Sequence, residues 1–479
     1  MSAGLLQLRK TELQRRTVEL PDEVNTWKTI VEQQVDMNLH WSQILAIKNL
    51  IDAYAKAYND ILAGLPSESD KPGYELGLYN LLTAIASAQR AWDFFRTKFE
   101  LRNSDRFKKR LRVADIIAID CYDAVMKVGI QNAWIAADAV REPPLTYLSP
   151  DISPMTWARG TRPNDGRTEE LEGKTLPIPV VEIPYDHLAN IWEFLAISHE
   201  VGHEIDADFK LLPSIKSNLT QAFKPTTVAP ERCRRWIGWT SEIFADLLGL
   251  QLSGPAFAVM LRNVLILPVN TVTNIVLGDV HPNHYLRIIL CAGYIRTMAD
   301  AAMGAGDAAF AQRLRDHAEN LQNDWIDLYG TPAALNDYLA DIPIVIAGIM
   351  DMPIDGLKGA TLRSVVAYTQ QQDSDIVSAA QNLQQGMTPL FAIAPRHAIA
   401  ATRLAISAAM AQGTLAAQID GITNATMRLV ENNAVRGMRA AADPLTGTPA
   451  GRLKRAATFV ADTLSAESPL HQRMTDPLP

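Results

Sequence analysis

A His-Glu-x-x-His run at the end of an apolar segment places the strongest constraint on what this chain can fold into. The run is His199-Glu200-Val201-Gly202-His203, and residues 190–198 before it contain no Gly or Pro. This composition predicts a buried helix. Positions i and i+4 of a helix share one face, so His199 and His203 can bind one metal ion. Glu200 is offset from that face, and we expect it to act as general base on a water rather than as a ligand.

A metal at this run needs a third protein ligand, and the sequence excludes two sources of it. The metzincin pattern requires Gly and then His after the second histidine, where this chain has Asp206 and Phe209. A di-iron carboxylate site would need a second Glu-x-x-His pair, and no other histidine here has an acidic residue three positions before it. The third ligand must therefore come from elsewhere in the chain.

Two carboxylates at i and i+4 interrupt an apolar stretch further along, at Glu242 and Asp246. A pair of acids on a buried helix is costly unless a positive group neutralises it, and a metal ion with its histidines would do so. We expect Glu242 to be the third ligand. We expect Asp246 to accept a hydrogen bond from the free ring N–H of a ligating histidine. The alternative is a solvated helix face carrying two ordinary acids.

Two segments extend the motif to that of a known group of enzymes. Glu242-Ile243-Phe244-Ala245-Asp246 resembles the Glu-x-x-Ala-Asp segment of gluzincin metallopeptidases, in the version of the HtpX-like and CAAX prenyl protease family. His281-Pro282-Asn283-His284-Tyr285-Leu286-Arg287 is similar to the His-Pro-x-x-x-x-Arg segment of those enzymes. The resemblance implies His281 as stabiliser of the transition state and Arg287 as its structural support. Hydrolysis also requires such a donor physically, because an oxyanion forms beside the metal.

Alternatives remain for this last segment. His281 could instead cap a helix that begins near Pro282, and His284 or Tyr285 could be the donor. The resemblance covers residues 175–300.

The chain departs from the family in three ways. Those enzymes are membrane proteins, whereas no apolar stretch here reaches the roughly twenty residues that span a bilayer, so the soluble relatives are the better comparison. Glu204 follows the second histidine, where an uncharged residue is usual. The stretch from His203 to Glu242 is also short for the family.

Composition excludes other classes of protein. The formal net charge of −8 argues against nucleic acid as the main partner. The basic run over residues 106–112 has Phe107 and Leu111 at i and i+4, as in a solvated helix face with an apolar anchor. The three cysteines are too scattered for a disulfide framework or a CxxC knuckle. Charge at Arg9 interrupts any secretory signal, so we expect a cytoplasmic protein without a membrane span.

The flanks of the motif have helical periodicity. Apolar stripes predict helices over residues 47–62, 74–99, 104–127 and 310–328. Ser104 is a candidate N-cap, and Gly330 a candidate C-terminal cap.

Between Pro143 and Pro184, prolines, glycines and short β-prone runs replace that periodicity. Candidate strands of a small sheet cover residues 145–148, 155–158 and 178–183. A zincin site commonly has an edge strand beside the motif helix, along which an extended peptide can add. Residues 159–174 are expected to form a mobile loop near the cleft, and residues 216–232 a loop between the ligand helices.

The sequence therefore predicts a mainly α protein with a small β-sheet. A zincin-like catalytic core over residues 141–300 is flanked by helical regions over residues 1–140 and 301–479. Zn²⁺ held by the two motif histidines and Glu242 would serve hydrolysis of a polypeptide substrate, within chains rather than at their ends. The alternative is a helical interaction or regulatory protein with an inactive zincin core, whose flanks contact a protein partner. An intact Glu200 favours the peptidase.

Overall fold

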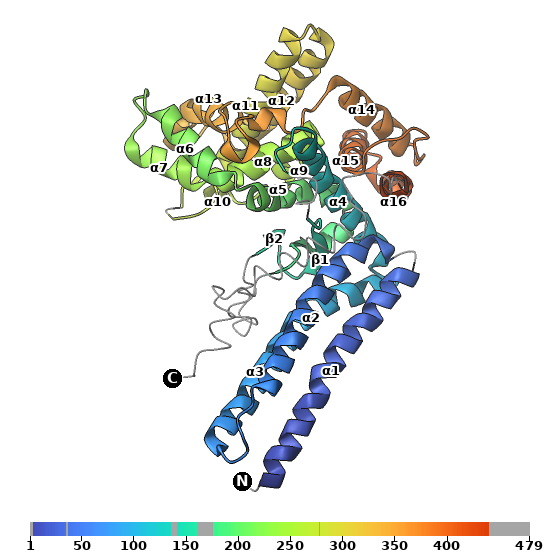
Figure 1. The fold of residues 1–479 in the computed structure, drawn as a ribbon. Coiled ribbons are helices and arrows are strands. Elements are labelled where there is room, and N and C mark those ends of the chain that lie inside the picture. Colours follow the sequence, from blue (N-terminus) through green and yellow to red (C-terminus); the bar gives the residue numbers. More distant parts are fainter. Residues whose placement is uncertain (1–2, 35–36, 136–140, 161–175, 277, 440–479) are drawn as a thin grey trace.

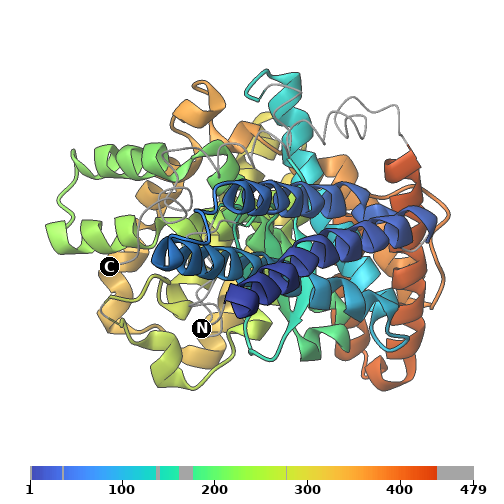
Figure 2. The same ribbon diagram turned by 60° about the horizontal axis from the view of Figure 1, so that its bottom comes forward.

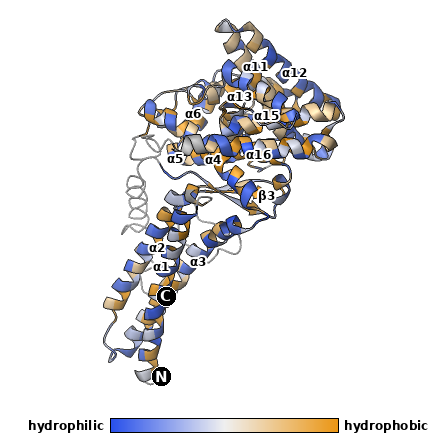
Figure 3. Ribbon diagram, turned by 90° about the vertical axis from the view of Figure 1, so that its right-hand side faces the viewer, coloured by the Kyte–Doolittle hydropathy of each residue, from blue (hydrophilic) through white to orange (hydrophobic). Residues whose placement is uncertain are grey.

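The computed structural model describes residues 3–34, 37–135, 141–160, 176–276 and 278–439. These residues are mainly helical and contain one three-stranded sheet, so the predicted fold class is confirmed at that level. Three long helices, which we call the stalk, project from a wider helical body (Figures 1 and 3). The sheet lies where the stalk and the body meet.

The stalk consists of α1 (Ala3–Gln33), α2 (Trp41–Ala63) and α3 (Lys71–Glu100), which lie side by side in Figure 2. They enclose a hydrophobic core of their own, in which Tyr54, Trp92 and Phe95 are among the largest side chains. At the start of α3, the side chain of Asp70 accepts a hydrogen bond from the backbone N–H of Gly73. Helices α2 and α3 contain the two predicted stripes over residues 47–62 and 74–99, whereas α1 was not predicted.

The sheet joins the two cores. Strand β3 (Val180–Pro184) is central, parallel to β1 (Leu145–Ser149) and antiparallel to β2 (Met155–Trp157). Val180 packs in the stalk core, while Val181 and Ile183 pack in the body core, because successive side chains of a strand point to opposite faces. All three predicted strands are confirmed, and β2 is an edge strand.

The helices of the body share one continuous hydrophobic core. They are α4 (Lys108–Gln131), α5 (Ala196–Phe209), α6 (Leu212–Phe223), α7 (Pro230–Gly238), α8 (Thr240–Ser253), α9 (Pro255–Val264), α10 (Val269–Thr273), α11 (His284–Gly304), α12 (Ala308–Tyr329), α13 (Asn336–Met350), α14 (Gln370–Gln384), α15 (Pro395–Ala411) and α16 (Leu415–Arg439). Short 3-10 helices connect elements at η1 (Asn38–His40), η2 (Leu101–Asn103), η5 (Tyr185–Leu188), η6 (Ile191–Leu195), η7 (Ala333–Leu335), η8 (Asp355–Leu357) and η9 (Leu362–Ser364). The division into three regions stays a prediction.

Two local predictions were wrong. Residues 216–232 are not a single loop, because α6 and α7 occupy most of that stretch and leave only residues 224–229 between them. Ser104 does not cap α4, which begins at Lys108 after a turn in which the Ser104 carbonyl accepts hydrogen bonds from Phe107 and Lys108. Helix α12 does end at Gly330, whose φ of 70° suits glycine. The predicted loop over residues 159–174 lies almost entirely outside the described residues.

A buried ion pair ties the stalk to the body. Arg102, just after α3, donates to both carboxylate oxygens of Asp115 on α4, at 3.0 and 2.7 Å. Its guanidinium also donates to the backbone carbonyl of Thr146 on β1, at 2.7 Å. Burial would raise the pKa of Asp115, but Arg102 and His40 outweigh it and hold that pKa well below its usual value. The junction of stalk and body therefore contains a buried ion pair between Arg102 and Asp115.

One stretch of the described residues, Ala333–Met350, is long and apolar enough to cross a membrane, with a mean hydropathy of 1.4. Half of it is buried inside the body, where α13 packs against α6 and α11. Apolar core helices meet the same criterion, so this is weak evidence for a span. The expected absence of a membrane span stays a prediction.

Candidate metal centre

Helices α5 and α8 carry the candidate ligands and lie unusually close together. The His-Glu-x-x-His run is on α5, as predicted, and its central Gly202 faces Ala245 on α8. A Cβ atom at Gly202 would lie 3.1 Å from the Cα and 3.3 Å from the Cβ of Ala245. A side chain at this position would therefore push the two helices apart by a few tenths of an ångström, and glycine allows the close approach that places side chains of one helix directly beside those of the other.

Three predicted ligands converge across this contact. Nε2 of His199 lies 3.3 Å from one carboxylate oxygen of Glu242, and Nε2 of His203 lies 3.5 Å from the other. One potential ligand atom from each residue falls within 4.8 Å of the others. Glu242 and Asp246 are both buried, so the alternative of a solvated helix face is wrong.

The outer nitrogens of both imidazoles have partners. Nδ1 of His199 lies 2.9 Å from Oδ1 of Asp246, the contact predicted for that residue. Nδ1 of His203 lies 3.4 Å from the hydroxyl of Ser241. Hydrogen bonding at Nδ1 leaves Nε2 of each ring available to a metal. Both Nε2 atoms face Glu242, as a shared ligand site requires.

Arg287 supports this arrangement from behind. Its Nε and Nη2 atoms donate to the two carboxylate oxygens of Asp246, each at 2.8 Å, in the forked geometry of a strong ion pair. Asp246 therefore connects Arg287 on α11 to His199 on α5. The predicted supporting role of Arg287 is directed at Asp246, not at His281.

The donor set fits a zinc ion. In a tetrahedral zinc site with bonds of about 2.0–2.2 Å, neighbouring ligand atoms lie about 3.3–3.6 Å apart. The separations of 3.3 and 3.5 Å from the two imidazole nitrogens to the Glu242 carboxylate are of that size, and they involve one carboxylate oxygen each. Two nitrogens and one carboxylate oxygen are also the ligands of many catalytic zinc sites, which keep a fourth position open. His203 and Glu242 are partly accessible, with side chains 22% and 11% exposed, so water can reach the centre.

The ionisable groups of the centre shift one another's pKa values. Burial lowers the pKa of His199, but hydrogen bonds to Asp246 and Glu242 outweigh it and raise the pKa to about 10. Burial and the neighbouring charge of His199 lower the pKa of His203 to about 4. Burial would raise the pKa of Glu242, yet the hydrogen bond and charge of His199 hold it well below its usual value. Without a metal, a proton on His199 therefore compensates the buried carboxylates.

Glu200 lies beside the centre without belonging to the ligand set. The hydroxyl of Thr156 on β2 donates to its carboxylate Oε2 at 2.7 Å. Burial raises the pKa of Glu200, while His199 and Thr156 partly offset that effect. A raised pKa makes a carboxylate a better proton acceptor near neutral pH.

Strand β2 is attached to the motif helix at two places. Besides the Thr156 contact, the backbone N–H of Arg159 donates to Glu204 at 2.9 Å, and the two side chains form a buried ion pair at 3.3 Å. Glu204, unusual for the family that the motif resembles, thus has a structural role. Together the two contacts hold the edge strand along α5.

The segment before α11 brings His281 to the mouth of the centre. Nε2 of His281 lies 3.5 Å from Glu242, and its Nδ1 lies 3.1 Å from Asp279. Its side chain is 47% exposed. His281 does not cap α11, so that alternative is wrong. The side chain of Asn283 is the cap, because it accepts hydrogen bonds from the backbone N–H groups of Tyr285 and Leu286 in the first turn.

Two other candidates for the donor role differ in their surroundings. Tyr285 donates its hydroxyl to the carbonyl of Gly330, away from the centre. Burial lowers the pKa of His284, and its Nδ1 makes no hydrogen bond with the described residues.

All seven predicted site residues thus lie in one region of the structure. Sequence reasoning missed three residues that position them: Thr156, Ser241 and Asp279. Ser241 directly precedes Glu242, and Asp279 lies two residues before His281. Hydroxyls and carboxylates this close to a site residue are too common in sequences to indicate a role. Thr156 lay in a predicted strand whose register against the motif helix is a tertiary property.

Comparison of the chain with models of protein families, with curated proteins and with solved structures finds no match.

A bulky residue at Gly202 should separate the ligand helices. We expect Gly202→Leu to destabilise the fold by about 1–3 kcal/mol through overpacking against Ala245, and to weaken zinc binding. The measurements are thermal unfolding and zinc titration. Gly304→Leu is the matched control, because nothing lies within 4 Å of a Cβ atom there. Equal stability of the two variants would contradict the packing argument.

The raised pKa of His199 predicts how the stability of metal-free protein depends on pH. The folded-state pKa of about 10 lies above an unfolded value of about 6.5, so this stabilisation is complete below pH 6.5 and disappears as pH rises through 10. In EDTA, the unfolding temperature should fall more steeply between pH 7 and 10 in wild type than in His199→Gln. His317→Gln, at a histidine whose pKa burial lowers, should keep the wild-type slope. Parallel curves for all three proteins would refute the assignment.

Proposed function

We propose that this chain is a zinc-dependent peptidase of the gluzincin type, with His199, His203 and Glu242 as ligands. The observation that carries the proposal is the convergence of these three side chains, whose potential ligand atoms lie within 4.8 Å of one another. The zincin-like core, the cytoplasmic location and the zinc cofactor belong to the same proposal. The motif resemblance supports it independently of the geometry.

The protein residues have distinct tasks in this proposal. Zinc would polarise the scissile carbonyl and acidify a water. Glu200 takes the proton of that water and passes it to the leaving nitrogen, for which its raised pKa is suited. His281, hydrogen-bonded at Nδ1 to Asp279, directs Nε2 toward the centre, where its imidazolium form would donate an N–H to the oxyanion. Asp246 and Arg287 keep His199 in the orientation that leaves Nε2 available.

The edge strand supports a polypeptide substrate. Strand β2 pairs with β3 on one side, and no other described strand pairs with it. Thr156 connects this strand to Glu200, so an extended peptide added along β2 would pass the general base. Strand addition needs no free chain end, which favours cleavage within chains.

A second candidate function follows from the stalk. Three long helices with their own core project from the body, and Leu5, Leu8 and Val18 on α1 are exposed. Such a surface suits a protein partner, and the chain could then be an interaction or regulatory protein whose centre is inactive. The same stalk is also compatible with a peptidase that is guided by a partner.

Removal of the general base separates the two functions. We expect zinc-loaded wild type to cleave unfolded casein, and Glu200→Gln to lose at least about 100-fold in rate while retaining zinc. Glu231→Gln, an exposed glutamate on α7, should keep full activity. Stoichiometric zinc without cleavage by wild type would favour the interaction protein, and full activity of Glu200→Gln would reject the assigned base.

Zinc affinity should depend on the carboxylates in a graded way. Glu242→Ala removes a ligand and should abolish tight zinc binding, as should His203→Ala. Asp246→Asn changes only the partner of His199 and should weaken binding by about 10- to 100-fold. Competition titration with a zinc chelator measures all three, with Asp316→Asn on the exposed side of α12 as control. Unchanged affinity in Glu242→Ala would eliminate it as the third ligand.

A further inference from the structure

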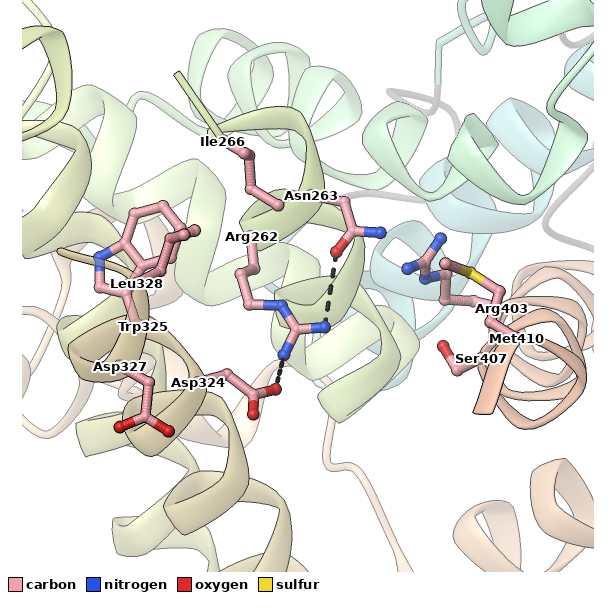
Figure 4. Close-up of a pocket in the computed structure, with 10 residues that line it drawn as sticks. All are labelled: Arg262, Asn263, Ile266, Asp324, Trp325, Asp327, Leu328, Arg403, Ser407 and Met410. Carbon is pink, nitrogen blue, oxygen red and sulfur yellow. Dashed lines mark hydrogen bonds and ion pairs between the residues drawn. The ribbon is translucent and has the colours of Figure 1, made fainter. Parts of the chain in front are cut away.

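A second cavity, separate from the metal centre, lies among α9, α12 and α15 (Figure 4). Its volume of about 590 Å³ is in the range of sites for small organic molecules. Arg262 and Asn263 reach it from α9 and Arg403 from α15, and Figure 4 shows the two guanidiniums on either side of the Asn263 carboxamide. None of its lining residues belongs to the proposed peptidase site.

Arg403 is a buried cation that forms no ion pair with the described residues. Its residue surface is only 3% exposed, and among the described residues no carboxylate lies within ion-pair distance of it. Its Nε has no hydrogen-bond partner. The carboxamide oxygen of Asn263, when it faces Arg403, accepts from both terminal nitrogens but carries no charge. Burial and the nearby Arg262 lower the pKa of Arg403 to about 10, and the carboxylate of Glu193, which lies beyond ion-pair distance, offsets only part of that effect.

The other charges of the cavity restrict what could neutralise Arg403. Arg262 is already paired with Asp324, and Asp327 is a second, exposed acid on the same helix. These two carboxylates repel a doubly charged anion such as phosphate. Arg403, the arginine of this cavity without an ion pair, therefore favours a ligand with a single negative charge, and the planar fork of arginine matches a carboxylate.

The rest of the cavity is suited to an apolar body. Ile266, Leu328 and Met410 line it, and they are 52%, 54% and 54% exposed. Large apolar side chains with this exposure, gathered at one cavity from three parts of the chain, are characteristic of a ligand site.

We propose that this cavity binds a small amphipathic monocarboxylate, with its carboxylate on Arg403 and its aromatic or aliphatic body against Ile266, Leu328 and Met410. The ligand carboxylate would give Arg403 a close ion pair and a hydrogen-bond partner for its Nε. Ser407, one turn beyond Arg403 on α15, offers a further donor at the cavity wall.

Binding of 3-phenylpropionate to the wild-type protein, followed by isothermal titration calorimetry, tests the proposal. The neutral 3-phenylpropanamide has the same body without the charge and should bind at least about tenfold more weakly. Inorganic phosphate should bind more weakly than 3-phenylpropionate. Equal affinity for the acid and the amide, or tighter binding of phosphate, would overturn the proposed ligand class.

A variant locates the binding site. Arg403→Met should reduce the affinity for 3-phenylpropionate by at least about tenfold while unfolding at a temperature no lower than wild type, because it removes an unpaired buried charge. The control is Arg315→Met. Arg315 lies on α12, does not line the cavity and pairs with Asp300 on α11, so this variant should bind 3-phenylpropionate as wild type does. If Arg403 were a structural residue only, Arg403→Met would lose stability and keep the wild-type preference for acid over amide, and the proposal would fail.

Discussion

The close packing of α5 on α8 is the interaction on which the candidate centre depends. Because Gly202 has no side chain, the backbone of one helix reaches Ala245 on the other, and the residues three positions before and one position after this contact meet across it. His199 and His203 come from one helix, and Glu242 and Asp246 from the other. A wider separation would leave Glu242 in an apolar helix without the imidazoles that neutralise it, and Asp246 with Arg287 as its partner.

Further ion pairs and hydrogen bonds surround this contact and connect it to neighbouring elements. Asp246 lies between His199 and Arg287, and Thr156 and Arg159 attach the edge strand to Glu200 and Glu204 on the motif helix. Each buried charge of this region therefore has a partner that also fixes an element in place. Arg403 is different, since it forms no ion pair with the described residues and Glu193 acts on it only from beyond ion-pair distance, and this difference is what sets the cavity among α9, α12 and α15 apart.

The residues of the candidate site could be predicted from the sequence better than the contacts between its elements. Fixed spacings on a helix placed His199, Glu200 and His203, and two acids in an apolar stretch indicated Glu242 and Asp246, because both signals are local. Thr156 and Ser241 were missed because their contacts join elements distant in sequence. Helix α1 was missed although Leu6, Leu13, Leu20 and Trp27 recur at a heptad spacing, since charged residues dominate between them. The prolines within residues 216–232 favour a loop in the sequence, because proline interrupts helices. In the structure Pro230 begins α7, where its fixed φ suits the first turn of a helix.

An anomalous difference map, from crystals of the zinc-loaded protein measured at the zinc absorption edge, tests the central claim most directly. The account predicts a single strong peak about 2.0–2.2 Å from Nε2 of His199, Nε2 of His203 and a carboxylate oxygen of Glu242. A peak at other residues, or coordination that leaves Glu242 outside bonding distance, would contradict it.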